Sequence, residues 1–195
     1  MLNSKIGYKI YDNVFSSEEC KNIITYCEKN GTKGNGNFIG ENVEDTYIRS
    51  SKITWIEDNH LYQKIMPIIS DANKSANWCF NLLRIEPLQF TRYDIGDKYE
   101  WHFDMDEKVY GSNHPLSGLL RKISFSILLS DDFKGGEFQI ETGHPGIKDR
   151  IHTVEKFNKI GSILIFPSYL PHRVLPVTEG IRNTLVGWCC GPPWK

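Results

Sequence analysis

Two segments far apart in the chain carry side chains that bind metal ions. His102 and Asp104 lie two residues apart, and His172 follows the apolar stretch 163–166 and a proline-bounded turn. Because residues two apart project from the same face of a β-strand, the first two side chains can reach one ion. Two imidazoles and one carboxylate, with coordination positions left open, form the ligand set of non-haem iron(II) sites. The sequence therefore predicts a metal site at His102, Asp104 and His172.

Each part of this prediction has a simpler alternative. A His-x-Asp pair arises easily by chance, so His102 and Asp104 could be a surface histidine beside a solvated acid. His172 could be a turn histidine whose ring is satisfied by local hydrogen bonds. The other histidines begin a predicted helix or lie in loops and turns, and they are weaker candidates: His60, His114, His144 and His152.

A strand shortly after His172 adds residues that suit an organic ligand. By the period of two, four residues share one face of the predicted strand at 181–189: Arg182, Thr184, Val186 and Trp188. Such a mixture inside a domain indicates the wall of a cavity. The planar guanidinium of Arg182 can bind a carboxylate through two hydrogen bonds, and a neighbouring hydroxyl can add a third. The alternative is an ion pair between Arg182 and an acid such as Glu179.

The composition limits the kind of protein. At 195 residues the chain suits one domain, and its net charge of −1 argues against strong nonspecific attraction to nucleic acid or anionic membranes. No apolar run reaches the length of a membrane span, and the first residues lack the apolar core of a secretory signal. The five cysteines form no Cys-x-x-Cys motif, which argues against a disulfide framework and predicts a reducing, cytoplasmic location.

Helical patterns come first along the chain. Ser16 and Glu19 form a capping box ahead of an apolar stripe, and Gly31 is expected to end this helix. The polar stretch 31–45 predicts a mobile loop. A second amphipathic helix is predicted at about 59–73.

Strand patterns follow from residue 78 onward. Short runs rich in β-branched and aromatic residues alternate with glycine and proline turns at 79–86, 88–94, 98–104, 121–129, 136–141, 150–155, 161–166, 172–177 and 181–189. Many short strands without intervening helices predict a sandwich or barrel. We therefore expect a single domain, with a helical support region at 1–77 and a β core at 78–195.

Four segments, in this order along the chain, resemble the prolyl 4-hydroxylase-like branch of the Fe(II)- and 2-oxoglutarate-dependent dioxygenases: residues 89–104, 121–131, 135–138 and 171–182. The resemblance covers roughly residues 80–190. It implies an α+β, mainly β fold whose core is a double-stranded β-helix, or jelly roll, with supporting N-terminal helices. It also implies that His102, Asp104 and His172 bind Fe(II), in agreement with the ligand pattern.

The resemblance assigns further residues to the cosubstrate and the substrate. Arg182 would hold the distal carboxylate of 2-oxoglutarate, with help from Tyr93 and Thr184. The positions that contact the substrate in the family are occupied here by Tyr99, Arg121 and Trp188. Some relatives have a tyrosine that touches the cosubstrate on the strand at 123–129. This chain has none there, and Ser124 could share the task.

The implied activity is hydroxylation of a prolyl residue in a protein or peptide. Fe(II), 2-oxoglutarate and O2 would be required, with succinate and CO2 as coproducts and ascorbate in a supporting role. The polar segment 105–119, directly after Asp104, is a predicted lid over the substrate.

Three alternatives remain open beside prolyl hydroxylation. One is a hydroxylase of a free amino acid or another small molecule. A nucleic-acid demethylase is a second, but the basic surface and the second arginine shortly after Arg182 that it usually needs are missing. The third is a metal-binding jelly-roll module without catalysis. Loss of a metal ligand or of Arg182 would mark such a module, and the sequence keeps all four residues.

Overall fold

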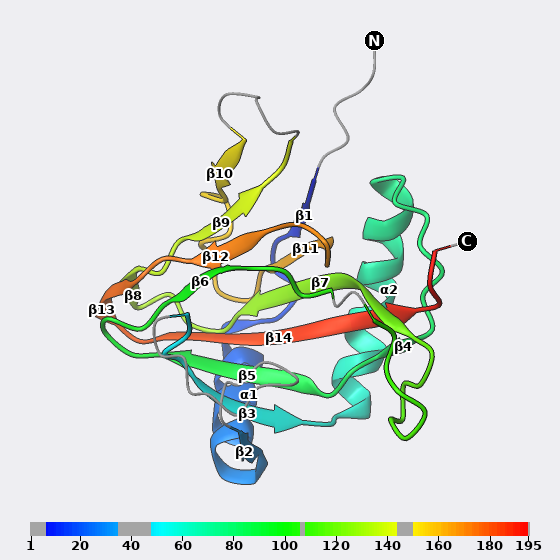
Figure 1. Cartoon of the computed structure of the whole chain (residues 1–195). Helices are drawn as coiled ribbons and strands as arrows, with labels where there is room; N and C mark the ends of the chain where they lie inside the picture. Colours follow the sequence, from blue (N-terminus) through cyan, green and yellow to red (C-terminus); the bar gives the residue numbers. More distant parts are fainter. Residues whose placement is uncertain (1–6, 35–47, 106–107, 144–149, 195) are drawn as a thin grey trace.

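The computed structural model describes residues 7–34, 48–105, 108–143 and 150–194, which form two β-sheets, a two-stranded ribbon and two helices (Figure 1). The large sheet contains β1 (Lys9–Tyr11), β2 (Thr32–Gly34), β3 (Lys52–Ile56), β4 (Arg84–Ile85), β5 (Leu88–Tyr93), β7 (Leu120–Leu128), β11 (Ile163–Pro167) and β14 (Arg182–Gly191). The small sheet contains β6 (Tyr99–His102), β9 (Phe138–Glu141), β10 (Ile151–Thr153) and β12 (His172–Val174). The ribbon pairs β8 (Phe133–Gly135) with β13 (Val177–Gly180). The prediction of a mainly β fold is confirmed.

The strand that carries Arg182 lies in the middle of the large sheet. The sheet order is β1-β11-β7-β14-β5-β3-β2, with β4 also paired to β14, and β14 runs antiparallel to both β7 and β5. The small sheet has the order β10-β9-β12-β6, so the two strands that end or begin at the predicted metal ligands are direct neighbours. The fold therefore places Arg182 on a central strand of the large sheet, and the two histidines on the neighbouring strands β12 and β6 of the small sheet.

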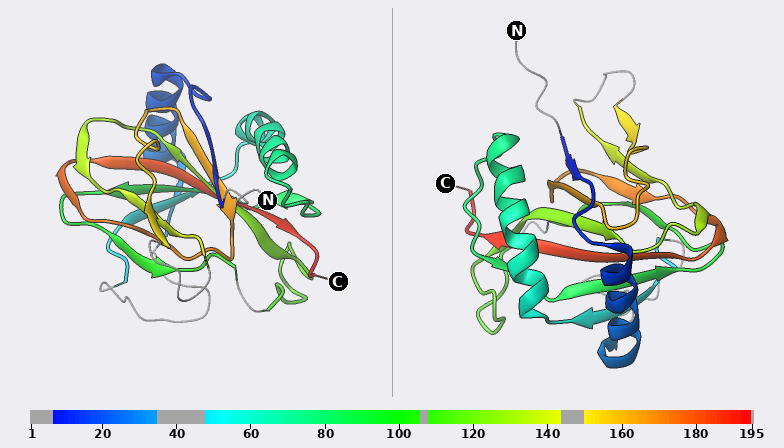
Figure 2. Two further views of the ribbon diagram at one scale, coloured as in Figure 1. Left: turned by 90° about the horizontal axis from the view of Figure 1, so that it is seen from above. Right: turned by 180° about the vertical axis from the view of Figure 1, so that it is seen from behind.

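The two helices form where the sequence predicts them. In α1 (Ser17–Asn30), the Ser16 hydroxyl accepts a hydrogen bond from the Glu19 backbone N–H at 3.1 Å. The Glu19 carboxylate accepts one from the Ser16 N–H at 2.8 Å, which completes the capping box. Gly31 ends this helix, and α2 spans Asn59–Ser75. In the right view of Figure 2 both helices lie in front of the large sheet.

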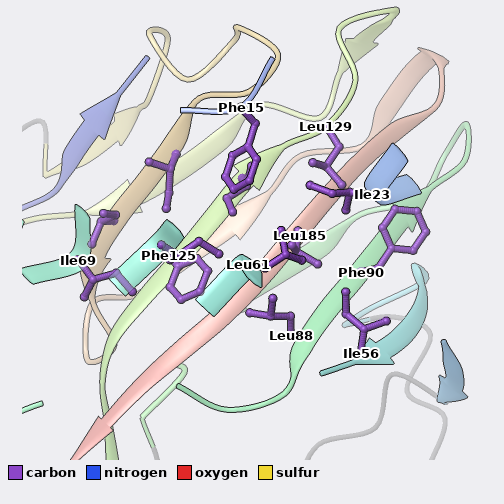
Figure 3. Close-up of a cluster of buried hydrophobic side chains, with 14 of the residues drawn as sticks. Phe15, Ile23, Ile56, Leu61, Ile69, Leu88, Phe90, Phe125, Leu129 and Leu185 are labelled. Atoms are coloured by element: carbon purple, nitrogen blue, oxygen red, sulfur yellow. The ribbon is translucent and has the colours of Figure 1, made fainter. Parts of the chain in front are cut away.

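Alternating residues of the large sheet face two separate hydrophobic clusters. On β11, Ile163 and Ile165 pack with the helices in one cluster, whereas Leu164 and Phe166 pack in the other with residues of the small sheet. Figure 3 shows part of the helix-side cluster, including Phe125 of β7. This period of two follows from the geometry of a strand buried on both faces. The helices thus close one face of the sheet, and the other face is left for the site.

Sequence reasoning missed several strands. The stretch expected as a loop at 31–45 begins with β2, and its residues from 35 onward lie outside the described part of the chain. Strand β3 pairs with β5 and β2, so the region at 1–77 contributes strands as well as helices. Ile53 and Ile56 of β3 are buried, but three positions apart they do not show the strict alternation of a half-buried strand.

All five cysteines are free thiols, and Cys20, Cys27, Cys189 and Cys190 are buried. The predicted absence of a disulfide framework agrees with this. Within the described ranges, neither helix is long and apolar enough to cross a bilayer.

Candidate active site

The two candidate histidines face each other across neighbouring strands. His102 is the last residue of β6 and His172 the first of β12, and they are register partners with ring centroids 4.1 Å apart. The Asp104 carboxylate lies 3.7 Å from His102 Nε2 and 3.4 Å from His172 Nε2. One ligand atom from each residue lies within 4.8 Å of the other two. The three side chains that the sequence pattern singled out as metal ligands therefore lie together in the structure.

Hydrogen bonds to backbone carbonyls orient both imidazoles. His102 Nδ1 lies 2.8 Å from the Glu100 carbonyl oxygen, and His172 Nδ1 lies 2.9 Å from that of Leu170. When Nδ1 donates its proton in this way, Nε2 keeps the lone pair that a metal needs. Burial, together with the positive charge that His172 would carry, lowers the pKa of His102 to about 3. His102 is therefore a neutral ligand at neutral pH.

Asp104 is held in an ionised form by its surroundings. Burial opposes ionisation, but His172, His102 and Arg121 outweigh it and lower the pKa of Asp104. The Asp104 backbone N–H donates to the Ser168 carbonyl at 3.1 Å. The fully buried Ser124 hydroxyl lies 2.9 Å from Ser168 Oγ and is also a hydrogen-bond partner of Asp104. Ser124 thus sits behind the metal ligand. It is not among the residues that line the cavity described below, whereas Ser126 is.

Two β-bulges, one on β7 and one on β6, allow residues an odd number of positions apart to point toward the same side of their strand, the side of the metal ligands. On β7, Lys122 is an extra residue between the register pairs Ile123–Cys189 and Arg121–Cys190. On β6 the register shifts between Tyr99 and His102. The Tyr99 ring therefore stacks on His102 with centroids 3.5 Å apart, although strict alternation would put residues three apart on opposite faces.

Arg182 lies at the other end of the site as a buried charge. Its side chain is 2% exposed, and it is the register partner of Tyr93 on β5. Among the described residues no carboxylate forms an ion pair with it, and Glu179 pairs with Lys134 instead. This excludes the Arg182–Glu179 alternative. Burial lowers the pKa of Arg182, and the exposed Glu137 offsets this only in part.

A buried hydroxyl beside Arg182 also lacks a partner. Thr184 is next along the same face of β14, and its Oγ1 makes no hydrogen bond to any residue that the structure describes. Close to them, Gly136 leaves the space that the arginine needs, because a Cβ there would lie 2.7 Å from Arg182 Cδ. A buried cation and an unpaired hydroxyl together fit a carboxylate ligand.

These residues line one cavity of about 770 Å³ between the two sheets. Its walls include the metal-ligand cluster, the residues expected to bind the cosubstrate apart from Ser124, and the three expected to bind the substrate: His102, Asp104, His172, Tyr93, Arg182, Thr184, Tyr99, Arg121 and Trp188. The expected face of β14 is confirmed, because Val186 also lines the cavity while Leu185 packs in the helix-side cluster. His60 and His152 do not line it, and His144 lies outside the described residues.

Several cavity residues were missed by sequence reasoning. Glu86 forms a buried ion pair with Arg121 at 2.7 Å. Arg49 lies over the Tyr99 ring at 4.6 Å and hydrogen-bonds Gln89 at 2.6 Å. Tyr110 and His114, from the segment expected as a lid, stack on each other and line the wall. No short motif marks these residues, because their proximity depends on the pairing of distant strands.

A comparison with models of protein families shows which family this chain belongs to. The model of the 2OG-Fe(II) oxygenase superfamily matches residues 88–190, which is more than half of the chain and includes all three candidate metal ligands and Arg182. The chain belongs to this superfamily. Its cofactors are accordingly Fe(II) and 2-oxoglutarate, and the cluster of two histidines and one carboxylate fits the iron.

Curated relatives match part of the chain. A PKHD-type hydroxylase of Gloeothece citriformis is 38% identical over 109 residues, which cover 54% of this chain and 43% of the relative. A PKHD-type hydroxylase of Rippkaea orientalis is 36% identical over 128 residues, covering 65% and 52% respectively. The chain spans about half the length of these curated relatives.

Solved structures confirm the double-stranded β-helix fold. A prolyl-4-hydroxylase of Pseudomonas putida superposes with a TM-score of 0.65 at 20% identity, over 94% of this chain and 91% of that one. A viral collagen prolyl hydroxylase from Paramecium bursaria chlorella virus 1, in complex with 2-oxoglutarate, gives 0.66 at 22% identity, over 95% and 97%. A Trichoplax adhaerens prolyl hydroxylase in complex with a peptide fragment gives 0.64 at 20%, over 94% and 83%.

Proposed function

We propose that this chain hydroxylates a prolyl residue within a protein or peptide. The observation that carries the proposal is the wall beside the metal ligands. There the Arg121 guanidinium lies 3.9 Å from the Trp188 ring centroid, and Tyr99 stacks on His102. The Trp188 indole N–H is buried without a hydrogen-bond partner among the described residues. Aromatic faces with a free N–H donor suit an uncharged ring next to a backbone carbonyl.

The similar proteins support this substrate. The relatives that match the sequence are PKHD-type hydroxylases, and the three solved structures above are prolyl hydroxylases. One of those structures holds a peptide fragment. We therefore propose a protein or peptide that contains proline as the substrate.

We also propose the reducing, cytoplasmic location that the sequence predicts from its cysteines.

In this proposal the chain divides its tasks between the two ends of the cavity. His102, Asp104 and His172 hold the iron. Arg182 pairs with the distal carboxylate of 2-oxoglutarate. The Thr184 hydroxyl donates to the same carboxylate, which satisfies two groups that are otherwise buried without partners. Tyr93 completes the wall beside Arg182 through its ring, whose centroid lies 5.3 Å from Cζ.

Bound iron and 2-oxoglutarate would supply the oxidising chemistry together with O2. One oxygen atom of O2 would enter the succinate that 2-oxoglutarate forms on loss of CO2, and the other would become the hydroxyl group of the substrate. The protein's own residues fix the geometry around that chemistry. Carbonyl oxygens of Glu100 and Leu170 lock the histidine tautomers, and Ser168 fixes the backbone of Asp104. Tyr99 and Trp188 exclude water from the substrate side of the cavity, which strengthens the electrostatic interactions inside it.

Mass spectrometry of substrates after turnover tests this function. The enzyme with Fe(II), 2-oxoglutarate and ascorbate is incubated with a panel of proline-containing peptides, with free proline and with free lysine. We expect a gain of one oxygen on a prolyl residue in at least one peptide. Oxygen gained on a free amino acid, with none on any peptide, would favour the small-molecule alternative.

A Trp188→Ala variant tests the substrate wall separately. It should lose peptide hydroxylation and retain some succinate formation, because iron and 2-oxoglutarate are held by other residues. A variant that still hydroxylates the peptide at the wild-type rate would contradict the assigned role of Trp188.

A further inference from the structure

Arg121, the arginine of the substrate wall, already forms an ion pair with a buried carboxylate of the protein, that of Glu86. Glu86 Oε1 accepts from Arg121 Nε at 2.8 Å, and Glu86 Oε2 accepts from Arg121 Nη2 at 2.7 Å. The two side chains are only 6% and 13% exposed. This is a bidentate pair of the kind that arginine makes with a bound carboxylate. The position that an acidic ligand would take is therefore filled from within the protein.

Two further donors converge on the same carboxylate. The Tyr110 hydroxyl donates to Glu86 Oε1 at 2.7 Å, and the Cys190 thiol lies 3.1 Å from that oxygen. The Glu86 backbone N–H donates to the Trp188 carbonyl at 2.9 Å, which ties Glu86 to the central strand. Burial by itself would lower the pKa of Arg121, but the hydrogen bonds and charge of Glu86 raise it above its ordinary value. Both charges of the pair are thus maintained in the buried site.

One nitrogen of Arg121 remains for a ligand. Its Nη1 has a single long contact, 3.5 Å, to the carbonyl oxygen of the metal ligand Asp104. This nitrogen lies on the side of the metal centre, and Arg121 lines the cavity. A neutral carbonyl can accept from Nη1 without disturbing the pair. A carboxylate would have to lose its hydration beside a guanidinium whose charge Glu86 already balances.

From this geometry we propose that Glu86 determines the charge selectivity of the substrate pocket, reserving Arg121 for a neutral carbonyl and rejecting a carboxylate next to the reacting residue. The inference rests on the proposed function for the nature of that residue, a proline. It adds that the proline must be internal to the chain or capped, since a terminal proline carries a carboxylate at this place. Glu86 acts through Arg121 and is a positioning residue.

Two probes that differ only in this charge test the inference by binding. N-acetyl-glycyl-prolinamide and N-acetyl-glycyl-proline are titrated calorimetrically into the full chain loaded with Mn(II), a redox-inert substitute here, and 2-oxoglutarate. The wild-type protein should bind the amide at least tenfold more tightly than the carboxylate. Equal affinities, or a preference for the carboxylate, would overturn the inference without the need for any variant.

The Glu86→Gln variant removes the negative charge that balances Arg121, and glutamine has nearly the same size as glutamate. Its affinity for the carboxylate probe should rise at least tenfold over the wild type, and the gain should weaken as salt is added. An unchanged or undetectable affinity of the folded variant for the carboxylate would refute the role of Glu86. The double variant Glu86→Gln/Arg121→Gln is the matched control, because it has the same amide at position 86 and no guanidinium. If the double variant also bound the carboxylate probe more tightly than the wild type, loosened packing and not the charge of Arg121 would explain the increase, and the inference would be wrong.

Hydroxylation of the amide probe, measured separately with Fe(II), distinguishes this inference from the proposed function. Selective binding without any oxygen gained on a prolyl compound would contradict prolyl hydroxylation and leave the charge selection standing. Hydroxylation of both probes at equal rates would support prolyl hydroxylation and overturn the charge selection.

Discussion

His102 and His172 are register partners on β6 and β12, with their rings 4.1 Å apart and Asp104 within 3.7 Å of both Nε2 atoms. The pairing of β6 with β12 in the small sheet therefore sets the positions of the two histidines of the candidate metal site. Its geometry follows from backbone hydrogen bonds as well as from the ligands themselves.

Removal of one histidine should abolish metal binding. We expect His172→Ala to weaken Fe(II) or Mn(II) affinity by more than the ~10–100-fold that loss of a second-shell partner typically costs. Succinate formation should fall to background. Metal content after dialysis measures the effect, and His152→Ala, which changes an exposed histidine away from the cavity, is the control. A His172→Ala protein that retained a full equivalent of metal would contradict the assignment.

Arg182→Met should weaken binding of 2-oxoglutarate by about 2 kcal/mol or more, because a charge-assisted bidentate pair is lost. Metal affinity should stay nearly unchanged. Thr184→Val should have a smaller effect, about 1 kcal/mol, since it removes one neutral donor. The Michaelis constant for 2-oxoglutarate reports both, and a wild-type value in Arg182→Met would show that another group holds the cosubstrate.

Ser124 should act on the metal ligand and have little effect on the cosubstrate. Because its hydroxyl lies against Ser168 and Asp104, Ser124→Ala should weaken metal binding by about 1 kcal/mol and leave the Michaelis constant for 2-oxoglutarate close to the wild-type value. Ser126→Ala, which changes a serine that does line the cavity, is the matched variant. If Ser124→Ala raised that Michaelis constant without changing metal affinity, the result would support the expectation that Ser124 helps to bind the cosubstrate.

Tyr110 should hold the segment that follows the metal ligands. Among the hydrogen bonds of the described residues 108–119, the Tyr110–Glu86 bond is the one that reaches another part of the chain. Tyr110→Phe removes it, and this segment should then exchange its amide hydrogens faster while α2 exchanges at the wild-type rate. Equal exchange of the segment in both proteins would show that packing, for example of the buried Leu116, is sufficient.

The capping box of α1 should make stability depend on pH. The hydrogen bond from Lys64 and that from the Ser16 backbone lower the pKa of Glu19 from 4.5 to about 2. A lowered carboxyl pKa contributes stability above the unfolded value, and this contribution is lost as pH falls from about 4.5 to about 2. Glu19→Gln should therefore reduce the melting temperature at neutral pH and approach the wild type near pH 2. A constant difference across this range would contradict the link.

The parts of the site that follow local rules were predictable. The alternating face of β14 depends only on the period of two. His102 and Asp104 lie together as expected, but β6 ends at His102 and Asp104 lies in the bend that follows, so the strand period alone does not place them. The capping box at Ser16 depends on residues three apart. Each of these signals lies within a few neighbouring residues, and the structure confirms them.

The remaining features depend on pairings between distant segments. The bulge at Lys122 changes which residues of β7 face the cavity, and no periodicity indicates its position. The contact between Glu86 and Arg121 joins the turn before β5 to the start of β7. Arg49 reaches Tyr99 through an isolated bridge. Such contacts are set by sheet register, which the order of residues in one strand does not specify.

The ratio of products in a single reaction tests the central claim most directly. The enzyme is given Fe(II), O2, limiting 2-oxoglutarate and an excess of each of a panel of proline-containing peptides in turn, and both succinate and hydroxylated prolyl residues are counted. For at least one peptide we expect close to one hydroxylated prolyl residue for each succinate formed, with Arg182→Met and His172→Ala losing both products together. Succinate formed without any oxygen on a prolyl residue, for every peptide offered, would contradict the central claim.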